Sequence, residues 1–261
     1  MNYHKPVLLQ STCHFLAVKP RARYIDATLG GGGHTAEIIR LGGQVLGIDQ
    51  DPEALSACPE LEGLIKVHSN FIHLTEVAEE YNWFPVSGIL FDLGVSSHQI
   101  DTPQRGFSFQ ADGSLDMRMD PSLPITAATL VNRLSVNELS KIFKDFGEIP
   151  VSKTLAQKVI AARPLATTSQ LAEIAGKWSR QAFQAIRIAV NDELGAIQSA
   201  LPQAYDLLEP GGRLVVISFH SLEDCLVKNF FKSVAGEILT PKPILGEKGA
   251  KLRAFSKYAQ T

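Results

Sequence analysis

The chain of 261 residues lacks any long hydrophobic run. No stretch approaches the roughly 18 consecutive apolar residues that a membrane-spanning helix needs. The N-terminus also lacks the charged region followed by an apolar core that marks a secretion signal. These absences exclude the membrane-protein classes, and they predict a cytoplasmic protein with no membrane partner.

Cysteine is scarce, with three residues spread over the chain. Cys13, Cys58 and Cys225 form no CxxC pair and show no Cys/His spacing typical of a metal site. Scattered cysteines in odd number are typical of reduced structural thiols. We therefore expect no bound metal.

The chain also lacks the excess of positive charge that is typical of a nucleic-acid-binding protein, since its formal net charge is -2. The charge is nevertheless segregated. Residues 148–190 hold six Lys/Arg against two Glu, and residues 228–261 hold seven against two. This distribution allows a basic face for RNA phosphates on a mildly acidic protein. Solvated helix faces rich in lysine are the alternative interpretation.

Strand and helix patterns alternate in the N-terminal part, within a chain that is 45% hydrophobic. Short apolar runs at residues 24–27, 45–48, 64–67 and 88–91 favour strands. Such alternation predicts an α/β fold with a parallel sheet flanked by helices. A buried strand is expected at 214–219, after a turn at Pro210-Gly211-Gly212, and the tail from 237 to 257 could close the sheet with an antiparallel hairpin.

The alternation breaks at Asp101, which predicts a mainly helical inserted domain over 101–189, while 1–100 and 190–261 form the main domain. Within the insert, Ser135 and Glu138 form a capping-box pattern before an amphipathic helix, and Thr168 opens another helix. Residues 182–208 are expected to form one long helical segment. Ser221 is expected to cap the helix after the following strand.

The most informative segment runs from Asp26 through Gly30-Gly31-Gly32-Gly33 to His34, a strand that leads into a glycine loop and then a helix. Glycines allow the backbone to approach a bound nucleoside, and their free N–H groups face the ligand. Asp49, at the end of the second strand, can accept both ribose hydroxyls of an adenosine. The pattern fits S-adenosyl-L-methionine or NAD, and an ordinary strand-to-helix turn remains an alternative.

Asp92 emerges from an apolar run at the end of the fourth strand, within Phe91-Asp92-Leu93-Gly94. Open α/β sheets bind ligands at this edge, so Asp92 could accept hydrogen bonds from a substrate amine or from the cofactor. Phe71, after the third strand, could bracket an adenine or lie in the core.

Several motifs together resemble the bacterial ribosomal RNA small-subunit methyltransferase H family, also called MraW. They are Asp26-Ala-Thr-Leu-Gly-Gly-Gly-Gly-His-Thr35, Phe91-Asp-Leu-Gly-Val-Ser-Ser97, Arg105-Gly-Phe-Ser-Phe109, Leu115-Asp-Met-Arg-Met-Asp120, Phe183-Gln-Ala-Ile-Arg187 and Ile217-Ser-Phe-His-Ser-Leu-Glu-Asp224. The resemblance implies a Rossmann-like class I methyltransferase sheet with an inserted helical domain for substrate recognition. It also implies methylation of the N4 amine of a cytidine in the decoding region of 16S ribosomal RNA. The partners would be 16S rRNA and the small ribosomal subunit, with no DNA.

The resemblance also implies a set of S-adenosyl-L-methionine contacts at Gly32, Gly33, His34, Asp49, Phe71, Asp92 and Gln99. Asp92, or a backbone carbonyl near Gly94, is the expected acceptor for the proton that the amine loses. No cysteine lies in a motif as a nucleophile, which favours direct N-methylation over carbon-5 methylation. Because the target base must be displayed outside a helix, Phe107 or Phe109 could stack on it, unless both anchor their loop.

The chain departs from the family pattern at three places. His98 precedes Gln99 where the family usually has proline, Ile149–Thr154 replaces a basic stretch of the insert, and the segment before the last strand is reduced to Gly246-Glu-Lys-Gly249. The trimmed basic segments leave a non-catalytic ribosome-assembly RNA-binding protein as one alternative. An NAD-dependent oxidoreductase is the other, because the glycine loop and Asp49 suit either nucleotide.

Overall fold

The computed structural model describes residues 6–258. Residues 1–5, on which the expectation of no secretion signal partly rests, lie outside the described residues. The chain divides into two compact units, one formed by Met1–Gly94 with Leu194–Thr261 and the other by Val95–Glu193. The second unit begins before and ends after the span 101–189 expected for the insert. Within residues 6–258, no helix has the length and apolar character to cross a membrane.

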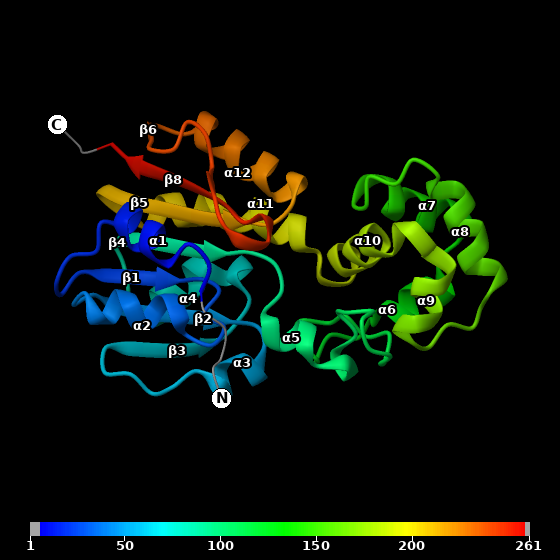
Figure 1. The fold of residues 1–261 in the computed structure, drawn as a ribbon. Helices are drawn as coiled ribbons and strands as arrows, with labels where there is room; N and C mark the ends of the chain where they lie inside the picture. The colour runs from blue at the N-terminus through cyan, green and yellow to red at the C-terminus, as the bar shows by residue number, and fades with distance from the viewer. Residues whose placement is uncertain (1–5, 259–261) are drawn as a thin grey trace. The chain divides into compact units, whose positions relative to one another are not determined.

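The first unit is built on one sheet with the strand order β3-β2-β1-β4-β5-β8-β6, and β7 pairs with β8 (Figure 1). The parallel strands are β1 (Arg23–Asp26), β2 (Gln44–Asp49), β3 (Leu64–His68), β4 (Val86–Asp92) and β5 (Leu208–Ser218). The strands β6 (Gly236–Ile238), β7 (Ile244–Leu245) and β8 (Lys251–Lys257) form the antiparallel edge. This arrangement confirms the predicted α/β class.

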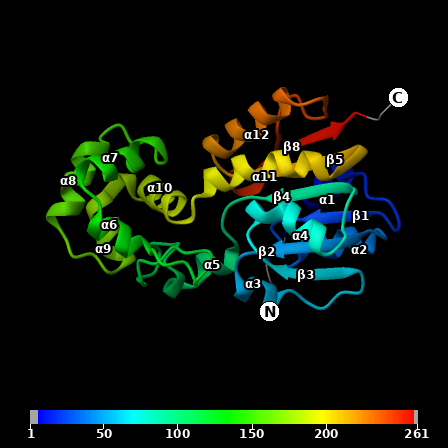
Figure 2. The ribbon, with the colours of Figure 1, turned by 180° about the vertical axis from the view of Figure 1, so that it is seen from behind.

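Helices cover both faces of the sheet because its central strands are apolar on both sides. Tyr24 packs on the face of α1 (Leu9–Leu16) and α2 (Gly33–Arg40). Its neighbour Ile25 packs in a different core with residues of α4 (Leu74–Glu80), α11 (Glu193–Leu207) and α12 (Ser221–Ser233). These three helices cover the opposite face of the sheet (Figure 2). The short helices α3 (Pro52–Ala57), η1 (Phe71–His73) and η4 (Glu247–Gly249) lie in connections. Two-residue alternation therefore produces two separate cores in this unit.

The second unit is helical, as predicted for the insert. Its elements are α5 (Ser97–Asp101), η2 (Pro103–Arg105), α6 (Ala127–Arg133), α7 (Val136–Asp145), α8 (Ser152–Ala161), α9 (Thr168–Ala175), η3 (Gly176–Trp178) and α10 (Ser179–Asn191). The capping box predicted from Ser135 and Glu138 is present at the start of α7. A core that includes Leu139, Phe143 and Ile186 joins these helices.

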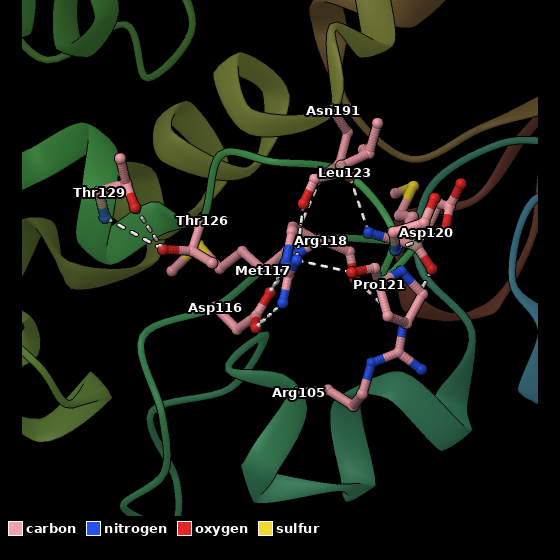
Figure 3. A network of polar contacts seen from close by, with 12 residues as sticks. Arg105, Asp116, Met117, Arg118, Asp120, Pro121, Leu123, Thr126, Thr129 and Asn191 are labelled. Carbon is pink, nitrogen blue, oxygen red and sulfur yellow. Dashed lines mark hydrogen bonds and ion pairs between the residues drawn. The ribbon is translucent and has the colours of Figure 1, made fainter.

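Polar contacts hold the long connection between η2 and α6 (Figure 3). Arg105 donates to the carbonyls of Arg118 and Met119 at 3.1 and 2.9 Å. Asn191 at the end of α10 accepts from the Met119 N–H at 2.8 Å and donates to the Met117 carbonyl at 2.7 Å. The guanidinium of Arg118 forms a bidentate pair with Asp116. A segment without regular structure is thereby fixed by side-chain bonds to its backbone.

Three local expectations are corrected. The segment 182–208 is not one helix, because Asp192 has a left-handed backbone (φ 46°) that ends α10. Pro210-Gly211-Gly212 lies within β5, where the register with β4 shifts, and does not precede the strand. The N-cap of α12 is His220 and not Ser221, since Glu223 completes a capping box with His220.

Candidate functional site

Three neighbouring parallel strands each end on an aspartate. Asp26 is the last residue of β1, Asp49 of β2 and Asp92 of β4, and β1 lies between the other two. Because parallel strands carry their carboxyl ends to the same edge of a sheet, these carboxyl groups share one edge. This is the edge at which open α/β sheets bind ligands.

The glycine loop connects the end of β1 to α2. Gly30 and Gly32 have left-handed backbones, with φ of 52° and 76°, and Gly32 is the N-cap of α2. A Cβ atom on Gly32 would lie 2.6 Å from the Sγ of Cys58. Both the backbone conformation and the space therefore require glycine at position 32, whereas Gly33, the first residue of α2, has an ordinary helical backbone.

Asp49 ties the glycine loop to the end of β2. Its Oδ2 accepts the Gly30 N–H at 2.7 Å, and its Oδ1 accepts the Asp51 N–H at 2.8 Å. Burial raises the pKa of Asp49 to about 6. Each carboxylate oxygen has two lone pairs, so both can still accept a hydroxyl group. Asp49 is thus placed both to shape the loop and to bind a ribose.

Asp26 is engaged within the protein. Its Oδ2 accepts from the Thr35 hydroxyl at 2.7 Å, and its Oδ1 accepts the Thr28 N–H at 3.2 Å. The side chain is buried, which raises its pKa to about 6. These bonds make Asp26 a clamp between β1 and α2.

Asp92 is less satisfied than the other two aspartates. Its Oδ1 is buried and has no hydrogen-bond partner among residues 6–258. Burial, together with the negative charges of Asp26 and Glu223, raises the pKa of Asp92 to about 8. The backbone N–H of Asp92 donates to the Thr28 hydroxyl at 2.7 Å. A buried oxygen without a partner is costly, and a ligand donor at this position would relieve that cost.

His34 lies beside Asp92, with its Nδ1 3.6 Å from Oδ2 of Asp92. Its Nε2 donates to the Val7 carbonyl at 2.9 Å, and burial lowers the pKa of His34 to about 4. The ring is therefore neutral at pH 7, and the Nδ1 that faces Asp92 is an acceptor. At this pH the contact is between two uncharged groups and is not an ion pair.

Phe71 and Gln99 occupy different surroundings. Phe71 opens η1 and packs edge-on against Phe91, with ring centroids 5.6 Å apart. Only part of its ring is buried, so both expectations for Phe71, core packing and a ligand contact, stay open. Gln99 belongs to the second unit, where it forms a capping box with Ser96 at the start of α5. The other six predicted cofactor contacts, Gly32, Gly33, His34, Asp49, Phe71 and Asp92, all belong to the first unit.

Sequence reasoning missed two threonines that organise the strand ends. Thr28 accepts from the backbone of Asp92, and Thr35 donates to Asp26. The Thr35 contact could have been suspected from its place in the first turn of the helix after the glycine loop. Thr28 pairs with a residue 64 positions away, which no local pattern indicates.

The fold and the strand-end groups together define a class, that of Rossmann-like α/β proteins with a nucleotide-type site at the carboxyl edge of the sheet. The solved structure of a candidate rRNA-methylase from Clostridium thermocellum has the same fold, with a TM-score of 0.51, 14% identity and coverage of 99% of each chain. At this identity the likeness concerns the fold alone.

Sequence comparison is more specific. The model of the MraW methylase family matches residues 1–259. The ribosomal RNA small subunit methyltransferase H of Thermomicrobium roseum is 47% identical over 259 residues, which cover 91% of this chain and 79% of the relative. That of Symbiobacterium thermophilum is 46% identical over 252 residues, covering 88% and 79%. The chain belongs to the MraW methylase family.

Proposed function

We propose that this protein transfers a methyl group from S-adenosylmethionine to the N4 amine of a cytidine in 16S ribosomal RNA of the small subunit. The observation that carries the proposal is the family match over residues 1–259. The names of the relatives at 46–47% identity, which specify small-subunit ribosomal RNA, agree with it. Family membership disfavours an NAD-dependent oxidoreductase.

We assign the cofactor site to the first unit, with Gly32, Gly33, His34, Asp49, Phe71 and Asp92 as its contacts. A cofactor contact of Gln99 stays an expectation from the family resemblance. The residues fit the cofactor. Asp49 retains lone pairs for ribose hydroxyls, and Gly32 leaves no room for a side chain where the loop turns. The partly exposed ring of Phe71 offers a surface for the adenine.

The cofactor supplies an activated sulfonium methyl group, and the protein must orient the amine and accept its proton. The N4 lone pair of cytidine is delocalised into the ring, so positioning provides most of the acceleration. The N4–H becomes acidic as the new bond forms. We assign proton acceptance to Asp92, whose Oδ1 has no partner among the described residues. The ionised form of Asp92 is the competent one.

We assign RNA recognition to the Val95–Glu193 unit, which carries the net positive segment 148–190. The small ribosomal subunit would be the physiological partner, in the cytoplasm. DNA is not expected as a substrate, because the family resemblance is to ribosomal RNA enzymes throughout.

Transfer of labelled methyl from S-adenosylmethionine to purified small subunits that lack the modification tests this function. Mass spectrometry of the digested rRNA should show N4-methylcytidine. A 5-methylcytidine product would refute the assigned chemistry. Binding to the subunit without any transfer would instead favour the non-catalytic assembly protein.

A further inference from the structure

We propose that Phe109 and Arg180, both in the Val95–Glu193 unit, form a contact site for an unpaired nucleotide of the RNA substrate. Phe109 stacks on the base and Arg180 binds a phosphate. The proposal rests on the proposed function, because it takes ribosomal RNA as the substrate.

Phe109 presents an exposed ring that is held from one side. Its side chain is 41% exposed, which is unusual for phenylalanine. The ring lies against Phe183 of α10, with centroids 5.0 Å apart and an interplanar angle of 65°. Phe183 is itself only 5% exposed. A ring fixed in this way loses little conformational freedom when a base stacks on it.

Phe107 shows what a simple loop anchor looks like in the same segment. Its ring is partly buried against the core of the second unit, with the guanidinium of Arg105 5.8 Å from its centroid. Phe107 already anchors the loop, so an anchoring role does not explain the exposed ring of Phe109. Of the two phenylalanines that the sequence suggested for stacking, Phe109 is the one with an available surface.

Arg180 lies on α10 about one helical turn before Phe183. It precedes Phe183 by three residues on α10, so the two side chains lie on the same face of the helix. Arg180 is exposed, and among residues 6–258 it makes no ion pair. The contrast is Arg187 on the same helix, which is 15% exposed and bound to Glu193 through two contacts of 2.8 and 2.9 Å. Arg187 serves the fold, while Arg180 is available to a ligand.

The surroundings of Arg180 favour an anion. Lys177, three residues earlier, is exposed and lies 5.3 Å from the centroid of the Trp178 ring. Asp112, the acidic residue three positions after Phe109, accepts the Ser169 N–H at 3.1 Å, so its carboxylate is already engaged. An exposed aromatic ring together with exposed cations is the combination that binds single-stranded nucleic acids. A base paired within a helix would not offer its face to Phe109.

Binding of small subunits and their methylation by Phe109→Leu and Phe109→Tyr variants would test the stacking role. Leucine keeps the apolar packing on Phe183 but removes the aromatic face, so the Kd and KM for the subunit should rise about tenfold. Tyrosine should retain near wild-type values. Phe84→Leu is the matched control, because Phe84 is 43% exposed in the other unit. The affinity for S-adenosylmethionine should be unchanged in all three variants.

Arg180→Ala should weaken binding and reduce the salt dependence of log K by about 0.7, the value for one phosphate contact on a single strand. Arg133→Ala is its control, since Arg133 is an exposed arginine on α6 of the same unit and makes no ion pair among residues 6–258. Equal effects of the two arginine variants would overturn the site in favour of general charge. Wild-type Kd and salt slope in both Phe109→Leu and Arg180→Ala would overturn it outright. Because binding is measured directly, a wild-type protein that transfers no methyl group would count against the proposed function and not against this site.

Discussion

Asp49 accepts two backbone N–H groups in the protein and, in the proposed function, ribose hydroxyls as well. Replacement by alanine removes a charged acceptor from the backbone N–H groups and from the ribose hydroxyls. We expect Asp49→Ala to weaken S-adenosylmethionine binding by about 1 to 3 kcal/mol in calorimetry. Asp49→Asn, which keeps one oxygen acceptor, should lose less. An unchanged affinity in the alanine variant would rule out the ribose assignment, provided that its melting temperature shows an intact fold.

Asp92 leads to a prediction about pH. Burial and its anionic neighbours raise its pKa to about 8, so in the free protein the carboxyl group is largely protonated at pH 7. If the ionised form accepts the proton, kcat/KM should rise with pH and level off above about 8, because this parameter reports the free enzyme. The positively charged sulfonium of bound S-adenosylmethionine would favour the ionised form of Asp92. The corresponding limb in the pH profile of kcat should therefore lie at lower pH.

The control for this profile is Asp92→Asn, which keeps the shape of the side chain but cannot take up the proton. Its residual rate should show no limb near pH 8. If the rate of Asp92→Asn also rises with pH near pH 8, that rise belongs to another titrating group. A pH-independent wild-type rate between pH 6 and 9 would remove Asp92 from the proton transfer.

At the scale of elements, the turn from β1 into α2 depends on Gly32. Alanine at this position must adopt φ of 76° and must also displace Cys58 Sγ, which would lie 2.6 Å from the new Cβ. We expect Gly32→Ala to lower the free energy of unfolding by about 1 to 3 kcal/mol and to weaken cofactor binding. Denaturant unfolding and calorimetry measure the two effects.

Two further variants separate the causes. Gly211→Ala is the matched control for backbone strain, because Gly211 has φ of 83° and no atom within 4 Å of a Cβ. Adding Cys58→Ala to Gly32→Ala removes the close sulfur, so the double variant should recover the part of the loss that exceeds Gly211→Ala. No recovery would show that strain alone makes glycine necessary at position 32.

The elements also show how far the sequence can predict the molecule. Strands at 24–27, 45–48 and 88–91 could be located because short apolar runs alternate with helical patterns. The corresponding strands β1, β2 and β4 end on Asp26, Asp49 and Asp92. The candidate site at this edge follows from that pattern together with the glycine loop. The break at Asp192 could not be predicted, since a left-handed residue between two apolar helical patterns has no strong local signal.

Hydrogen bonds between residues far apart in the sequence could not be predicted either. The contact of His34 with the Val7 carbonyl spans 27 residues, and that of Asp92 with Thr28 spans 64. These contacts decide the tautomer of His34 and the position of Asp92, so the chemistry of the site depends on information that periodicity does not contain. The predicted N-cap of α12 was wrong because histidine, which caps this helix, is outside the usual set of small polar N-cap residues.

At the scale of the whole molecule, the balance of available positive charge limits how the protein can bind RNA. The two basic segments, 148–190 and 228–261, supply most of the unbalanced Lys/Arg residues. Several of these are already used within the protein. Arg187 pairs with Glu193, Arg253 pairs with Asp224, and Lys257 donates to the carbonyls of Tyr205 and Leu208. These internal contacts reduce the number of cations that can reach phosphates.

A protein with few phosphate contacts should bind naked RNA weakly and with only moderate salt sensitivity, because each neutralised phosphate contributes a slope of about -0.7 on single strands. Specificity must then come from shape, which a folded particle provides when it displays the target cytidine unpaired. We therefore expect efficient methylation of assembled small subunits and poor methylation of a short oligonucleotide with the decoding-region sequence. Rates of methyl transfer on the two substrates at equal concentration, measured at two salt concentrations, check this expectation. Equal rates would show that local sequence suffices for recognition, and a steep loss of activity with salt would show that more cations reach the RNA than the internal pairing leaves free.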